Sequence, residues 1–160
     1  MERKTNVHAD DGKQTILITR EFDLPVELLF KAHADPDLFG EWMTHEYATT
    51  KMVRFEGRPQ GAYRFETKDA QGKVVFSANG VFHEFVPNQK ITRTFEMENS
   101  PFSIQLEFLE FEKLTDDTSQ LRMYSVYRSV ELRDQLLKLP FAQGINMSHN
   151  RLQQIISQLK

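Results

Sequence analysis

The stretch FAQGINMSHNRLQQIISQL, residues 141–159, contains no proline and carries a single apolar stripe. The side chains of the stripe follow one another at gaps of 4, 7, 3, 1 and 3 residues, and they are Phe141, Ile145, Leu152, Ile155, Ile156 and Leu159. These gaps fit a period of 3.6 residues, so the stretch predicts a long amphipathic helix. Gly144 and Ser148 fall on or beside the stripe, which indicates a close approach of this helix to another backbone.

The middle of the chain has the composition of consecutive β-strands separated by turn residues. The expected strands are residues 47–56, 62–68, 73–86, 90–98, 102–113 and 119–127, with an irregularity expected at Asn79-Gly80. Connections this short join antiparallel neighbours, because parallel strands need long crossovers. We therefore expect an antiparallel meander that the C-terminal helix covers.

A further strand and two short helices are expected before this meander. Residues 14–22, QTILITREF, are rich in β-branched side chains and predict the strand. Pro25 suits the first turn of one short helix, and Asp35-Pro36 supplies the N-cap and first-turn proline of a second. Trp42 ends this second helix, near the expected mouth between the helices and the sheet.

The predicted fold class is α+β, with an antiparallel meander sheet of about seven strands, two short helices and one long C-terminal helix. Residues 1–13 are polar and are expected to form a flexible N-terminal tail. Residues 14–160 are expected to form a single domain, because a chain of 160 residues needs no second core.

The bulk composition excludes several classes of function. A net charge of −3 weighs against nucleic acid as a partner, because phosphate binding needs a basic surface. The chain has no cysteine, which excludes disulfides and cysteine-based zinc sites. No stretch approaches the roughly 20 apolar residues that span a bilayer, and no apolar leader is present, so we expect a cytoplasmic protein without a membrane partner.

Motifs that define active sites are missing from the sequence. There is no G-x-S-x-G elbow and no phosphate-binding glycine loop. The five histidines are scattered and form no H-x-x-x-H pair. We therefore predict no catalytic set, no metal site and no cofactor; Glu107, Tyr124 and His83 are the first residues to check for a general acid or base.

Aromatic side chains give the clearest functional hint, with 13 Phe, 4 Tyr and 1 Trp. Ordinary core packing explains each of them singly. Together they suggest an interior that a curved sheet and one long helix fill incompletely, and apolar pockets of this kind bind small ligands. The expected cavity residues are Trp42, Phe65, Phe82, Phe95, Phe108, Tyr124, Phe141, Ile145, Met147 and Ser148.

The order of elements resembles the helix-grip fold of the START-like superfamily, also called SRPBCC. Four segments resemble motifs of the bacterial family of activator of Hsp-ninety ATPase homologues, and they are ITREFDLPVELLF (residues 18–30), DPDLFGEWM (35–43), RPQGAYRF (58–65) and GVFHEFVPNQKI (80–91). A fifth, at residues 144–152, resembles the family's G-W-x-x-x-L-x-R-L helix, with Ile145 in place of Trp. The missing Trp leaves room in, or reshapes, the region where this helix faces the sheet.

Three functions remain open at this point. The first is binding of a small, mostly apolar molecule, such as a lipid, polyketide or aromatic metabolite, between the sheet and the C-terminal helix. The family name suggests the second, a co-chaperone-like module that stimulates a heat-shock ATPase. Relatives of this fold that do chemistry in the cavity suggest the third, an enzyme of cyclase or hydrolase type. We expect a monomer or a weak homodimer, since an edge strand is open to pairing.

Overall fold

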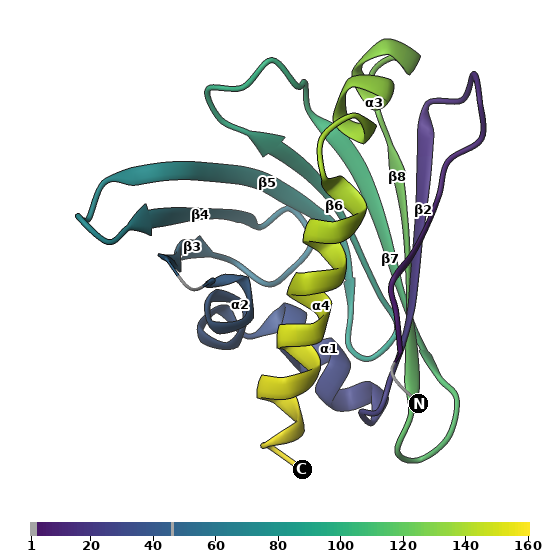
Figure 1. The fold of residues 1–160 in the computed structure, drawn as a ribbon. Coiled ribbons are helices and arrows are strands. Elements are labelled where there is room, and N and C mark those ends of the chain that lie inside the picture. Colours follow the sequence, from purple (N-terminus) through teal and green to yellow (C-terminus); the bar gives the residue numbers. More distant parts are fainter. Residues whose placement is uncertain (1–2, 46) are drawn as a thin grey trace.

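The computed structural model describes residues 3–45 and 47–160, in which a curved antiparallel sheet wraps around a long helix (Figure 1). The strands are β1 (Asn6–His8), β2 (Thr15–Phe22), β3 (Ala48–Phe55), β4 (Ala62–Asp69), β5 (Val74–Val86), β6 (Lys90–Met97), β7 (Gln105–Lys113) and β8 (Ser119–Val126). The helices are α1 (Val26–Ala34), α2 (Pro36–Met43), α3 (Val130–Leu137) and α4 (Phe141–Ser157). The predicted α+β helix-grip class is confirmed.

The strands form one open sheet in the order β1-β2-β8-β7-β6-β5-β4-β3, and all neighbours are antiparallel. The first expected strand, β2, joins the end of the meander by pairing with β8. The short strand β1 is an addition, since residues 1–13 were expected to form a tail. This addition makes β1, and not β2, one edge of the sheet, with β3 at the other edge.

Helix α4 runs along the concave side of the sheet, and α1 and α2 pack beside it (Figure 1). Its predicted stripe is buried most deeply at Leu152 and Ile156, whose side chains are fully enclosed in the main core. Phe141 and Ile145 are only partly buried and pack against a second, smaller core. The N-terminal half of α4 is therefore packed less densely than the rest.

Two local interactions fix the short helices, and one of them, the N-cap at Asp35, was predicted from the sequence. The Asp35 carboxylate accepts hydrogen bonds from the backbone N–H groups of Asp37 and Leu38, at 3.0 and 3.1 Å, and so caps α2. The indole Nε1 of Trp42 donates to the Ala32 carbonyl at 2.8 Å. This bond fixes the Trp42 ring between α1 and α2.

Two expectations about glycines are wrong. The register shift expected at Asn79-Gly80 lies elsewhere: β5 shifts against β6 between Phe82 and Glu84, and against β4 between Thr67 and Lys68. Gly144 does not mark a close approach, since a Cβ there would meet no heavy atom of the described residues within 4 Å. Small size at residue 144 therefore leaves open space beside α4.

Among the described residues, no helix has both the length and the apolar character needed to cross a membrane.

Candidate functional site

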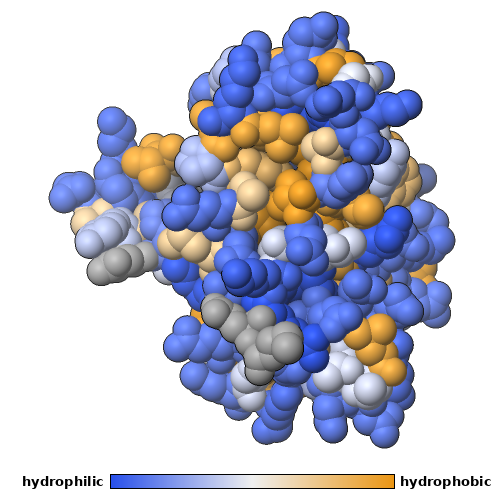
Figure 2. Space-filling model, turned by 45° about the vertical axis from the view of Figure 1, so that its right-hand side comes forward, coloured by the Kyte–Doolittle hydropathy of each residue, from blue (hydrophilic) through white to orange (hydrophobic). Residues whose placement is uncertain are grey.

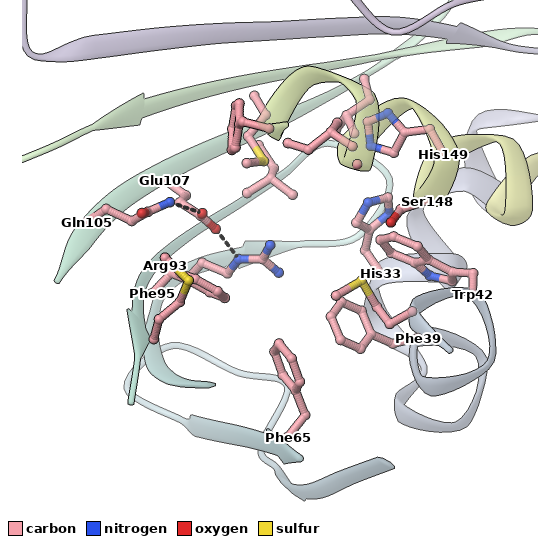
Figure 3. A pocket seen from close by; sticks show the side chains of 18 of the residues that line it. His33, Phe39, Trp42, Phe65, Arg93, Phe95, Gln105, Glu107, Ser148 and His149 are labelled. Atoms are coloured by element: carbon pink, nitrogen blue, oxygen red, sulfur yellow. Dashed lines mark hydrogen bonds and ion pairs between the residues drawn. The ribbon is translucent and has the colours of Figure 1, made fainter. Parts of the chain in front are cut away.

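A cavity of about 250 Å³ lies between the concave face of the sheet and the helices α2 and α4 (Figure 3). Its walls are mostly apolar, with Phe39 and Trp42 from α2, Phe65 and Phe95 from the sheet, and Ile145 from α4. The face drawn in Figure 2 is mainly hydrophilic, but apolar side chains gather in a hollow between hydrophilic rims near its centre. The cavity is therefore a mostly apolar space large enough for a small molecule.

The sheet side of this cavity carries a buried ion pair. Arg93 on β6 and Glu107 on β7 are direct strand partners, and Arg93 Nε donates to Glu107 Oε1 at 2.8 Å. Their side chains are only 12% and 4% exposed. Gln105, two residues along β7 on the same face, donates its Nε2 to Glu107 Oε2 at 2.7 Å. Both carboxylate oxygens therefore have donors.

Tyr63 on β4 lies next to this ion pair. Its hydroxyl donates to the Thr94 carbonyl at 2.6 Å, and the Arg93 guanidinium carbon is 5.7 Å from the centroid of its ring. Burial raises the pKa of the Tyr63 hydroxyl far above its ordinary value, and the charge of Glu107 acts in the same direction. The phenol is therefore protonated and serves as a fixed hydrogen-bond donor.

Two buried histidines, His33 of α1 and His149 of α4, form the opposite side (Figure 3). The Nδ1–H group of His33 donates to the Leu29 carbonyl at 3.0 Å, which leaves Nε2 as an acceptor when the ring is neutral. Burial, together with the positive charge of Arg93, lowers the pKa of His33 to about 4. The ring is neutral at pH 7.

His149 is tied to the N-terminal segment of the chain. Its Nδ1 and the Thr5 hydroxyl share a hydrogen bond at 2.8 Å, and the Thr5 backbone N–H donates to Asn146 Oδ1 at 2.9 Å. Burial lowers the pKa of His149 to about 3, helped by the proximity of His33 and Arg20. This ring is also neutral at pH 7, so neither histidine adds charge to the cavity.

Six of the ten cavity residues expected from the sequence lie in the lining, and they are Trp42, Phe65, Phe95, Phe141, Ile145 and Ser148. The structure thus gathers them from α2, β4, β6 and α4 around one space. Their contact with a ligand stays a prediction.

The other four lie outside the lining. Phe108 and Tyr124 are direct partners on β7 and β8, but they occupy the outer face, because their neighbours Glu107, Leu109 and Met123 face the cavity. Met147 is on the solvent side of α4 and is 54% exposed. Phe82 is buried behind Tyr63, with ring centroids 5.0 Å apart. Strand alternation accounts for Phe108 and Tyr124, the helical period accounts for Met147, and packing behind Tyr63 accounts for Phe82.

The cavity residues expected from the sequence did not include most of its polar residues. Arg93 precedes Phe95 by two residues on one strand, so the same alternation that turns Phe95 inward also turns Arg93 inward. Of the three acid–base candidates, only Glu107 reaches the cavity, whereas His83 and Tyr124 are exposed on the outside. In the described part of the chain, no cluster of three or more His, Asp or Glu side chains could hold a metal ion.

The fold and its internal cavity define the chain as a helix-grip protein. A family model described as "Activator of Hsp90 ATPase homolog 1-like protein" matches residues 23–157, and the chain belongs to this family. The resemblance inferred from the sequence motifs is thereby confirmed. No curated protein matches the chain.

Several solved structures share the fold. Protein Ms6760 from Mycobacterium smegmatis has a TM-score of 0.83 at 18% identity, covering 95% of this chain and 96% of its own. A protein from Rhodobacter sphaeroides has a TM-score of 0.86 at 17% identity, and the match covers 97% of this chain and 99% of that protein. CalU16 from Micromonospora echinospora has a TM-score of 0.62 at 18% identity, and the match covers 97% of this chain and 73% of CalU16. At these identities the likeness establishes the fold.

Proposed function

We propose that this protein binds a small, mostly apolar molecule in the cavity between the sheet and α4. The observation that carries the proposal is the cavity itself, about 250 Å³ with aromatic walls and a few placed polar groups. This combination is typical of small-molecule sites. The fold of this family commonly holds hydrophobic ligands, which supports the same function.

The size of the cavity narrows the class of ligand. An apolar cavity of about 150 Å³ accommodates benzene. A space of about 250 Å³ therefore suits a molecule of one or two rings better than a long acyl chain. Among the lipids, polyketides and aromatic metabolites that the sequence left open, compact aromatic compounds fit best.

An NMR titration tests the proposal directly. The single Trp gives one indole N–H signal, and Trp42 lies in the cavity wall. Compounds of one and two rings should shift this signal and the methyl signals of Ile145. The methyl group of Met147, on the solvent side of the same helix, is the internal reference and should stay in place. Shifts confined to Met147 and the outer face of the sheet would refute cavity binding.

The family description keeps a co-chaperone role as a second candidate. Such a role requires stimulation of the ATPase rate of an Hsp90 protein. We would measure that rate with and without the chain at equimolar concentration. An unchanged rate, together with cavity binding in the NMR titration, would leave ligand binding as the better supported function.

A further inference from the structure

Arg93 has hydrogen-bond donors that the protein does not use. A guanidinium group carries five N–H donors, and here only Nε is engaged, by Glu107. No described residue forms a hydrogen bond with the terminal nitrogens Nη1 and Nη2, and Figure 3 shows this end of Arg93 pointing into the cavity. Donors aimed into an apolar space favour a ligand that brings an acceptor atom.

The positive charge of Arg93, in contrast, is already compensated. Glu107 is its direct partner on the neighbouring strand, with Nε and Oε1 2.8 Å apart. Among the described lining residues, Arg93 and Glu107 are the only Lys, Arg, Asp or Glu side chains. His33 and His149 are neutral at pH 7, because burial lowers their pKa values to about 4 and about 3. The cavity as a whole therefore carries no net charge.

A ligand carboxylate would consequently enter the cavity without a countercharge of its own. It would approach an arginine that is shared with Glu107, and the two carboxylates would repel each other in a buried, apolar setting. An uncharged carbonyl oxygen would accept the same N–H donors without this cost. Aromatic rings flank the approach, with Phe65 6.3 Å from Phe95 and 5.4 Å from Phe39 between ring centroids.

We propose that the ligand is an uncharged compound of one or two rings whose carbonyl or similar acceptor oxygen binds the terminal nitrogens of Arg93, and that Glu107 excludes carboxylates of the same shape. This inference rests on the proposed function, since it names the chemistry of the molecule in that cavity. It predicts selectivity among ligands, which cavity binding alone does not.

Three probes of nearly equal shape test the selectivity, namely 2-acetylnaphthalene, 2-naphthoate and 2-isopropylnaphthalene. Affinities are measured at pH 7 from the indole N–H signal of Trp42. We expect the ketone to bind at least about tenfold more tightly than the carboxylate, and several-fold more tightly than the hydrocarbon. A carboxylate or hydrocarbon that binds as tightly as the ketone would overturn the inference and leave cavity binding intact.

A charge variant tests the role assigned to Glu107. Glu107→Gln keeps the shape of the side chain and leaves Arg93 as an uncompensated cation, so the preference should move toward 2-naphthoate. Glu110→Gln is the matched control, because Glu110 lies on the same strand, is exposed and faces the outer side. It removes the same charge without touching the cavity and should leave the selectivity unchanged. An unchanged preference in Glu107→Gln would contradict the proposal.

A double variant covers the case in which Glu107→Gln fails to fold. Arg93→Met with Glu107→Gln removes both charges and keeps the cavity neutral, so the ketone should lose its advantage over the hydrocarbon. Thermal unfolding confirms that each variant is folded before binding is compared. If none of the three probes binds the wild-type protein, the proposed function fails and this inference fails with it.

Discussion

Tyr63 and Gly80 are direct partners on strands β4 and β5, and the ring of Tyr63 occupies the space where a side chain at residue 80 would stand. A Cβ on Gly80 would lie 2.6 Å from the Tyr63 hydroxyl and 2.0 Å from the Thr94 carbonyl oxygen. Tyr63 donates its hydroxyl proton to this same carbonyl at 2.6 Å. The missing side chain therefore allows Tyr63 to reach across β5 to β6.

Gly80→Ala should destabilise the protein by about 1–3 kcal/mol, the usual cost of an overpacked interior. The contact at 2.0 Å involves backbone, so the strands themselves must shift. Urea unfolding at pH 7 measures the change. Because Tyr63 lies in the cavity wall, ligand affinity should fall as well. A variant with wild-type stability would show that the space above Gly80 is not needed.

Gly144→Ala should have the opposite effect on stability. Gly144 lies within α4, and a Cβ there would meet no heavy atom of the described residues within 4 Å. Alanine in place of glycine in a helix interior stabilises the folded protein by about 0.5–1 kcal/mol, because the substitution lowers the conformational entropy of the unfolded chain. The same urea experiment measures this gain. A loss of stability would mean that residue 144 has a neighbour after all.

Local signals explain why much of the fold could be predicted. The N-cap at Asp35 and the stripe on α4 depend on residues a few positions apart, so the sequence contains the whole interaction. The choice of face along β7 and β8 is not local. Strand alternation separates Phe108 from Glu107 and Leu109, but only the packing of the whole sheet decides which set turns inward. Phe108 and Tyr124 were misplaced for this reason.

The polar part of the cavity depends on residues that lie still farther apart in the sequence. Arg93 and Glu107 become partners through the register of β6 and β7, two strands joined by an irregular connection. His33 and His149 come from helices at opposite ends of the chain. No spacing in the sequence brings these four residues together, so a search for motifs could not find them. The alternation that turns Phe95 inward was the one available signal for Arg93.

Ile145→Trp should close the cavity to ligands. Ile145 lines the cavity at the position where the motif of the family has Trp, so an indole there would fill space that is now open. We expect the affinity for 2-acetylnaphthalene to fall at least about tenfold, while the folded state keeps or gains stability through added apolar contact. Met147→Trp is the matched control, because residue 147 is 54% exposed on the same helix. Equal binding by both variants would place the ligand elsewhere.

Acid should destabilise the protein through His33 and His149. Their pKa values are about 4 and about 3 in the folded state, against about 6.5 in an unfolded chain. Below pH 6.5 the unfolded state therefore binds more protons, and the free energy of unfolding falls as the pH falls. The slope approaches about 1.4 kcal/mol per pH unit for each histidine well below pH 6.5, and the loss is about 1–2 kcal/mol each between pH 6.5 and pH 5.

Urea unfolding at pH 7, 6 and 5 measures this dependence. His149→Gln removes one of the two buried imidazoles, so the fall in stability between pH 7 and pH 5 should be about half that of the wild type. His83→Gln is the comparison variant, because it replaces an exposed imidazole and leaves both buried ones in place. A wild-type stability that is flat from pH 7 to pH 5 would mean that the buried rings are reached by water and protonate as they do in an unfolded chain.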